Sequence, residues 1–144
     1  MTRVLFVCHG NVNRSPAAEI IARQLYPELQ IRSCGLKTKD GRITAKKMRD
    51  TLNTRGYTTA GIRSTAITQQ LVDWADHIFY MDGGNERRLE KAFGRLDKAQ
   101  RLSDYVPGAS TIPDPTWGED YKVHNRVVDM LTEALSNWRK TAAA

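Results

Sequence analysis

Short apolar runs alternate with longer amphipathic segments along this chain, and this alternation constrains the fold more than any other feature. The runs RVLFVC (residues 3–8), LQIRSCG (29–35) and HIFYM (77–81) have the length and composition of strands. Strands that are separated by helical segments are joined by crossovers and lie parallel. The pattern therefore predicts a three-layer, doubly wound α/β domain with a central, mostly parallel sheet of about four strands and flanking helices.

Helical periodicity and turn residues locate the connecting segments. Helices are expected over residues 16–26, 44–55, 68–76, 85–93 and 123–138. Pro16 is expected at the first helical position, where its missing N–H costs nothing, and Gly56 and Gly94 follow the ends of two helices. A weak strand around residues 100–102 completes the sheet and leads into a long loop. Trp74 and Trp138 lie on helical stripes and are expected in the core.

Length and composition favour a single globular domain, and the lack of a long apolar run favours a cytoplasmic location. The chain has 144 residues, of which 40 % are hydrophobic and 26 % charged, so we expect a single domain over residues 1–144. No apolar run approaches a membrane span, and a strand that begins at Arg3 leaves no room for a signal peptide, which predicts a cytoplasmic location and no membrane contact. Cys8 and Cys34 are then expected to be thiols.

The three histidines are not spaced as metal ligands. His9, His77 and His124 lie far apart in the sequence, and each is expected at the surface or in a loop. The sequence therefore predicts neither a metal site nor a cofactor.

The loop CHGNVNRS, residues 8–15, joins the first strand to the first helix and is predicted to bind phosphate. Backbone N–H groups that converge above a helix N-terminus form an anion cradle. Gly10 and Asn11 tolerate the unusual dihedral angles that such a loop requires. Arg14 adds a planar guanidinium that can grip two phosphate oxygens. The predicted phosphate-binding residues are His9, Gly10, Asn11, Val12, Asn13, Arg14 and Ser15.

Cys8 is the candidate nucleophile of this loop. A helix N-terminus and a guanidinium favour the thiolate form, which is the nucleophilic form of cysteine. The Ser15 hydroxyl either steadies the thiolate or only caps the helix. Asp114 is the candidate proton donor for the leaving oxygen, because Pro113 and Pro115 restrict its backbone. The alternative for Asp114 is an ordinary turn aspartate.

These residues together resemble the low-molecular-weight protein tyrosine phosphatases. The strand VLFVC, the loop CHGNVNRSP, SCG at residues 33–35, HIFYMD and the loop IPDPTWG occur in the family's order through nearly the whole chain. The resemblance implies a phosphatase for phosphomonoesters, above all protein phosphotyrosine, that needs no metal or cofactor. Cys8 would form a cysteinyl phosphate, Arg14 would hold the phosphate, and Asp114 would act as general acid and then base. Ser15 and Asn11 would support the thiolate.

The chain departs from the family's pattern at several positions. Asn13 stands where many members carry a second cysteine that protects the nucleophile, and Gly61 stands near a histidine that supports the loop asparagine. Thr116 occupies the place of an aromatic residue, so Thr116 and the neighbouring Trp117 are expected at the substrate rim. Val12 resembles the residue of tyrosine phosphatases, whereas phosphoarginine phosphatases carry threonine there.

A basic window extends from Lys37 to Arg63. It holds eight lysines and arginines against Asp40 and Asp50, in a chain of net charge +6. The window is either a solvated helix face or a surface that attracts an anionic partner, namely a phosphorylated protein, another phosphomonoester or a nucleic acid.

Two other functions remain open on the sequence. The loop could belong to a phosphate-binding or nucleic-acid-binding module without turnover, although binding alone needs neither a nucleophile nor an acid. An arsenate reductase-like enzyme would pass oxidation along three cysteines, and this chain has two.

Overall fold

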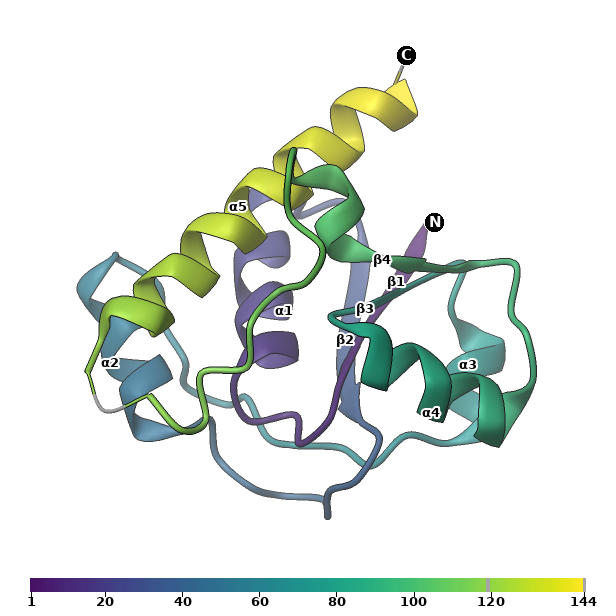
Figure 1. The fold of residues 1–144 in the computed structure, drawn as a ribbon, viewed down its shortest axis with the longest axis horizontal. Coiled ribbons are helices and arrows are strands. Elements are labelled where there is room, and N and C mark those ends of the chain that lie inside the picture. The colour runs from purple at the N-terminus through teal and green to yellow at the C-terminus, as the bar shows by residue number, and fades with distance from the viewer. Residues whose placement is uncertain (119, 144) are drawn as a thin grey trace.

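A computed structural model describes residues 1–118 and 120–143 and shows a parallel four-stranded sheet (Figure 1). The strand order is β2-β1-β3-β4, and every neighbouring pair is parallel. The strands are β1 (Arg3–Cys8), β2 (Gln30–Gly35), β3 (His77–Tyr80) and β4 (Ala99–Arg101). Since the chain order reverses on either side of β1, the sheet is doubly wound, as the sequence predicts.

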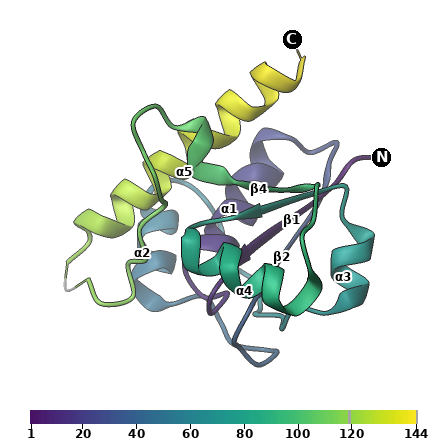
Figure 2. The same cartoon turned by 45° about the vertical axis from the view of Figure 1, so that its right-hand side comes forward.

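Helices cover both faces of the sheet and make three layers (Figures 1 and 2). One face carries α1, α2 and α5, and the other carries α3 and α4. Their bounds are α1 (Arg14–Leu25), α2 (Lys46–Thr54), α3 (Gln69–Trp74), α4 (Gly83–Phe93) and α5 (Lys122–Ala143). In the part of the chain described, no helix is long and apolar enough to cross a membrane.

The alternation of β1 side chains divides the apolar core between the two faces. Val4 and Phe6 are fully buried on the side of α1 and α5, whereas Leu5 and Val7 are fully buried on the side of α3 and α4. Each such side chain contributes about 1.5–3 kcal/mol when it leaves water. A strand that is buried on both faces is fixed in position, and so is the residue that ends it.

Several expectations about the elements are wrong in detail. Pro16 is the third residue of α1, which begins at Arg14. This position still lies in the first turn, where the N–H has no partner within the helix. A 3-10 helix, η1 (Leu102–Tyr105), replaces the start of the expected loop. Trp138 is buried in the core, but Trp74 is only half-buried.

Two histidines lie deeper than predicted. His124 is 3 % exposed at the start of α5, and burial lowers the pKa of its imidazole. His77 is half-buried in β3 and meets the ring of Trp138 edge to face. His77 lies beside Val4 of β1 in the sheet, and His124 is buried by the packing of α5. His9 does lie in a loop, as predicted.

The register of β1 with β2 places Cys8 at the carboxyl edge of the sheet, opposite Gly35. A Cβ on Gly35 would lie 2.8 Å from Thr38 Cγ2 and 3.0 Å from the carbonyl oxygen of His9. Glycine is therefore required at this position, because the chain beyond Cys8 passes against the end of β2. Ligands of open α/β sheets bind at this edge, near the point where the strand order reverses.

Candidate functional site

Cys8 ends β1, and the loop that follows folds around its sulfur. Cys8 is 3 % exposed. Its Sγ lies 2.9 Å from the Ser15 hydroxyl, and the backbone N–H of Asn11 donates to it over 3.3 Å. Asn11 has φ 55°, the left-handed conformation predicted for this loop. Two polar hydrogens can therefore face the sulfur, an arrangement that suits a thiolate better than a thiol.

The Asn11 side chain fixes the loop from behind. Its Nδ2 donates to Ser15 Oγ at 2.7 Å and to Ser33 Oγ at 3.0 Å, while its Oδ1 accepts from the Thr65 N–H at 2.8 Å. Since the amide occupies a lone pair of Ser15, the serine hydrogen can be donated to the sulfur at 2.9 Å, and the Cys34 carbonyl is a more distant acceptor at 3.4 Å. Ser15 is the second residue of α1 and Asn13 is the N-cap, so capping by Ser15 does not account for its position.

A buried carboxyl group continues this network. Ser33 Oγ donates to Glu19 at 2.6 Å, and Arg23 lies 2.6 Å from the other carboxylate oxygen. Burial raises the pKa of Glu19, although the Ser33 hydroxyl and the Arg23 charge act against this shift. Gly61, where the family resemblance suggested a supporting histidine, is an exposed turn residue with φ 84°. The support here comes from Ser33 and the backbone of Thr65.

Arg14 is held by two acceptors beneath the loop. Its Nη1 donates to Asp82 Oδ2 at 2.7 Å and to the carbonyl of Ile112 at 2.9 Å, and the side chain is 3 % exposed. Burial opposes ionisation of Asp82, but the hydrogen bonds from Arg14 and the Asn85 N–H outweigh it and hold the pKa of the Asp82 carboxyl below its usual value. Nη2 lies 3.6 Å from Asp114 Oδ2. The guanidinium is thus oriented before any ligand arrives.

Asp82 is a site residue that the sequence analysis missed. It lies two residues beyond the end of β3 and caps α4, since its Oδ1 accepts from the Asn85 N–H at 2.7 Å. A usable signal was present: an aspartate at the carboxyl end of the strand next to β1 lies at the same edge of the sheet as Cys8.

Asp114 stands over the loop on the segment that leads to α5. Its Oδ1 accepts from both the backbone N–H and the hydroxyl of Thr116, at 3.0 and 2.5 Å, and the side chain is 44 % exposed. Thr116 therefore aims the carboxyl group. Trp117 is 90 % exposed.

A cavity of about 290 Å³ brings the predicted residues together. Its floor and walls include Cys8, His9, Gly10, Val12, Asn13 and Arg14 from the loop, with Asp114 and Thr116 above. Asn11 and Ser15 are buried behind the loop. Trp117 is outside this lining, so its place at the substrate rim stays a prediction. Lys37 and Arg42 complete the lining, so one thiol, two guanidinium groups, one ammonium group and one carboxyl group surround a space that can accept a phosphate group.

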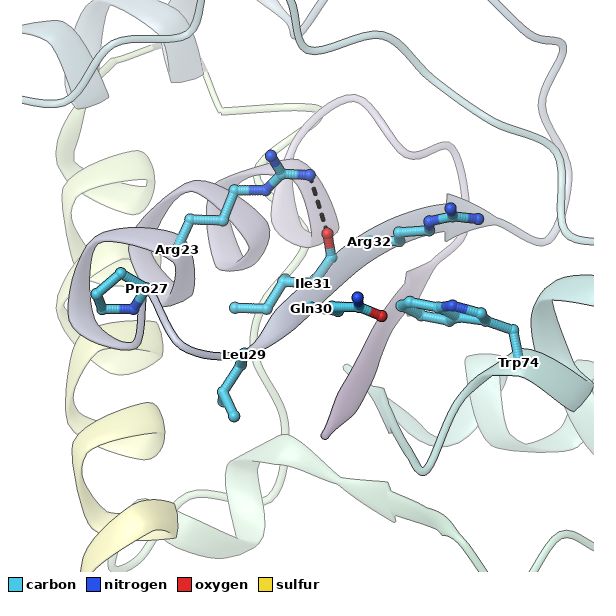
Figure 3. A pocket seen from close by; sticks show the side chains of 7 residues that line it. All are labelled: Arg23, Pro27, Leu29, Gln30, Ile31, Arg32 and Trp74. Atoms are coloured by element: carbon cyan, nitrogen blue, oxygen red, sulfur yellow. Dashed lines mark hydrogen bonds between the residues drawn. The ribbon is translucent and has the colours of Figure 1, made fainter. Parts of the chain in front are cut away.

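A larger hollow of about 480 Å³ lies elsewhere, along the free edge of β2 (Figure 3). Arg23 donates to the carbonyl of Ile31 and pairs with Glu19, while the Arg32 guanidinium lies 4.7 Å from the ring centre of Trp74. Both arginines already have partners, so size alone does not make this hollow the reactive site. Among the residues described, no three His, Cys, Asp or Glu side chains are grouped as metal ligands.

Comparisons with known proteins agree with this geometry. The family model described as low molecular weight phosphotyrosine protein phosphatase matches residues 3–144. A protein-arginine-phosphatase of Geobacillus stearothermophilus is 29 % identical over 96 % of this chain and 97 % of its own. The low molecular weight protein-tyrosine-phosphatase PtpB of Staphylococcus aureus is 29 % identical over 81 % of this chain and 82 % of its own.

A solved protein tyrosine phosphatase from Entamoeba histolytica superposes with a TM-score of 0.89 at 27 % identity, covering 99 % of this chain and 97 % of that one. The sheet order, the cavity lined by Cys8, Arg14 and Asp114, and these matches agree. The chain belongs to the low molecular weight phosphotyrosine protein phosphatase family.

Proposed function

We propose that this chain hydrolyses phosphotyrosine in proteins through a cysteinyl-phosphate intermediate on Cys8. The observation that carries the proposal is the placement of the Cys8 sulfur on the floor of a cavity that Arg14 and Asp114 also line. The polar hydrogens of Ser15 and Asn11 reach the sulfur from behind. A nucleophile, a cation and an acid around one small space are what phosphoryl transfer to a thiolate requires.

In the first step the Cys8 thiolate attacks the phosphorus of a bound phosphate monoester. The S–P bond forms as the bond from phosphorus to the substrate oxygen breaks, and protonated Asp114 gives its proton to that oxygen. The N–H groups of the loop and the Arg14 guanidinium hold the three remaining oxygens. Nη1 of Arg14 is already bonded to Asp82 and Ile112, whereas Nη2 faces the cavity-lining Asp114 at 3.6 Å, beyond hydrogen-bond distance, and is the nitrogen that would bind phosphate.

In the second step a water molecule attacks the phosphorus of the cysteinyl phosphate. Asp114, now a carboxylate, takes the proton of this water, and the S–P bond breaks to release inorganic phosphate and the thiolate. The Ser15 hydroxyl stabilises the departing sulfur at 2.9 Å. Both Cys8 and Asp114 return to their starting states, so the cycle closes without a reductant or an added metal.

An aryl phosphate suits the cavity better than a phosphoguanidinium. Val12 presents a branched apolar side chain in the cavity wall, where it can pack against a ring. The relatives include one named for arginine and one named for tyrosine, both 29 % identical but over 96 % and 81 % of this chain, so overall likeness does not favour tyrosine. Val12 favours phosphotyrosine, and phosphoarginine is the competing substrate to be measured beside it.

The other two functions lose support from the surroundings of the cysteines. Cys34 is fully buried in β2, and burial raises the pKa of its thiol well above the ordinary value. Such a thiol is inert and does not serve a redox relay with Cys8. A binding module without turnover would leave the Thr116 contacts that aim Asp114 without a purpose.

The test is hydrolysis of p-nitrophenyl phosphate, phosphotyrosine peptide and phosphoarginine peptide by the wild type and four variants. Cys8→Ser and Arg14→Ala are expected to abolish turnover, and Asp114→Asn to slow it by about 10²–10⁴-fold, the usual contribution of a general acid. Asp73→Asn, an exposed aspartate on α3, is the matched control and should behave as wild type. Mass spectrometry of Asp114→Asn after mixing with substrate should detect phosphate on Cys8. Turnover that survives in Cys8→Ser would refute the mechanism.

A further inference from the structure

We propose that three exposed cations beside the cavity select phosphotyrosine peptides that carry acidic residues next to the phosphorylated side chain. These cations are Lys37, Lys39 and Arg42, here called the basic rim. The inference rests on the proposed function and adds to it the class of substrate that the site takes.

The basic rim is tied to the phosphate-binding loop by the backbone. The Leu36 N–H donates to the Cys8 carbonyl at 3.0 Å, and the Lys37 N–H donates to the His9 carbonyl at 2.9 Å. At the other end of the segment, the Arg42 N–H donates to Ser64 Oγ at 2.8 Å. The rim therefore keeps a fixed position relative to the cysteine.

Two members of the basic rim line the same cavity as Cys8. Lys37 and Arg42 form part of its wall together with Val12 and Thr116. A Cβ on Gly10 would lie 4.0 Å from Arg42 Nη1, so the guanidinium lies over the phosphate-binding loop. A peptide whose phosphate sits on the loop must pass these two cations with the residues that flank it.

The basic rim forms no ion pair with the part of the chain that the structure describes: no carboxylate oxygen there lies within ion-pair distance of Lys37, Lys39 or Arg42. Asp40, which lies within the rim segment, accepts a hydrogen bond from the Ala66 N–H at 2.8 Å, and Asp114, which lines the same cavity, faces Arg14. The rim thus offers cations that a ligand can pair.

The rest of the basic window behaves differently. On α2, Lys46 pairs with Asp50 at 2.7 Å, and just after it Arg55 pairs with Asp129 of α5 at 2.5 Å. The window from Lys37 to Arg63 is therefore not one uniformly free positive face. Arg49 and Arg63 donate to backbone carbonyls and do not line the cavity, so the cations of the window that the cavity exposes to a bound ligand are Lys37 and Arg42.

This placement favours a peptide carboxylate over an extended polyanion. A single exposed ion pair shifts an equilibrium by up to about fivefold, so two pairs on the rim give a preference of about tenfold. Such contacts act mainly on association and weaken with salt. A nucleic acid would instead need a continuous track of unpaired cations, and the pairing of Lys46 and Arg55 interrupts it.

The experiment compares kcat/KM for three phosphotyrosine peptides that differ only in their flanking residues: Asp/Glu, Ala/Ser or Lys/Arg. The wild type at low salt is expected to prefer the acidic over the neutral peptide by about tenfold, and the basic peptide should be the poorest. In Lys37→Gln/Arg42→Gln the acidic-to-neutral ratio should fall to about one. In Lys37→Glu/Arg42→Glu the order should reverse. Lys46→Gln/Arg55→Gln removes the same charge from the paired part of the window and should keep the wild-type ratio.

The outcomes separate this inference from the proposed function. No turnover of any aryl phosphate would overturn the proposed function itself. Turnover with equal rates on the three peptides would overturn only the role of the basic rim. An equal loss on all three peptides in Lys37→Gln/Arg42→Gln would show that these cations hold the phosphate itself, and would also overturn it. The role of the basic rim in peptide selection would also be overturned by a third result. In this result Lys37→Gln/Arg42→Gln keeps the wild-type acidic-to-neutral ratio of kcat/KM, and a DNA oligonucleotide inhibits the wild type but not this variant.

Discussion

Asp82 is expected to control both stability and turnover, although it does not line the cavity. Its Oδ2 accepts a 2.7 Å hydrogen bond from Arg14, which is 3 % exposed. A hydrogen bond to a charged partner contributes about 1.5–3 kcal/mol, against about 1 kcal/mol for a neutral one. Asparagine has a single side-chain oxygen, so when this oxygen caps α4 as Asp82 Oδ1 does, the amide NH2 faces the Arg14 donor and the charged hydrogen bond is lost. Asp82→Asn should therefore lower the free energy of unfolding by about 2 kcal/mol.

A second variant separates the ion pair from the helix cap. The other oxygen of Asp82 accepts from the Asn85 N–H at the start of α4. Asparagine caps helices as well as aspartate does, whereas alanine forfeits about 1 kcal/mol. Asp82→Ala also leaves the buried Arg14 without its nearest partner, so the total loss should reach about 3 kcal/mol. Urea denaturation of the three proteins measures both differences.

Turnover should follow the orientation of Arg14. A loss of about 1.4 kcal/mol in the transition state is tenfold in rate, so Asp82→Asn should reduce kcat for p-nitrophenyl phosphate about tenfold. The pKa of Asp82 is held below its usual value, so its contribution is present at neutral pH and disappears as the pH falls through that lowered pKa. The stability gap between wild type and Asp82→Asn should therefore close in acid. Two results together would refute this account of Arg14: a kcat of Asp82→Asn equal to that of the wild type, and a loss of unfolding free energy in Asp82→Ala no greater than the roughly 1 kcal/mol of the helix cap.

Three further predictions concern packing, pH and oxidation. Gly35→Ala should destabilise the protein by about 1–3 kcal/mol in urea, because the added methyl would lie 2.8 Å from Thr38 Cγ2. Burial lowers the pKa of His124, so the unfolded chain binds this proton more readily; Tm should fall as the pH drops below about 6.5, and less so in His124→Gln. Hydrogen peroxide should convert Cys8 to its sulfinic acid, seen by mass spectrometry and not reversed by thiols, while Asn13→Cys should make the loss of activity reversible.

The fold could be predicted because the apolar runs, the helical periodicity and the turn residues all indicated the same α/β architecture. RVLFVC is apolar on both faces, and only a central strand buries both, which is where β1 lies. Asn11 was expected to take an unusual backbone conformation and has φ 55°. The errors lie where local sequence carries little information: Leu102 begins a 3-10 turn instead of ending a strand, and His124 is buried by the packing of α5. Tertiary contacts decide both.

The site residues that could be predicted are those whose residue type and local sequence indicate a chemical role. Cys8 and Arg14 share one loop, so spacing relates them, and the prolines that flank Asp114 mark it within its loop. Asp82 and Ser33 escaped notice because their roles depend on the strand order, which puts the ends of β2 and β3 on either side of β1. Residues at the ends of neighbouring strands cannot be predicted to contact one another from one sequence unless the strand order is known.

The way the cavity is built also separates its reactivity from its selectivity. The floor is fixed by β1 and the Asn11 network, which are buried, and by the contact of the buried Arg14 with the half-buried Asp82. The wall includes exposed side chains such as Lys37 and Arg42, whose replacement disturbs no core packing. Relatives at equal identity are named for arginine and for tyrosine. A floor that is buried and a wall that is exposed explain how one reaction can serve both: substitutions at the wall change which substrate enters, while the thiol and the guanidinium stay where the sheet holds them.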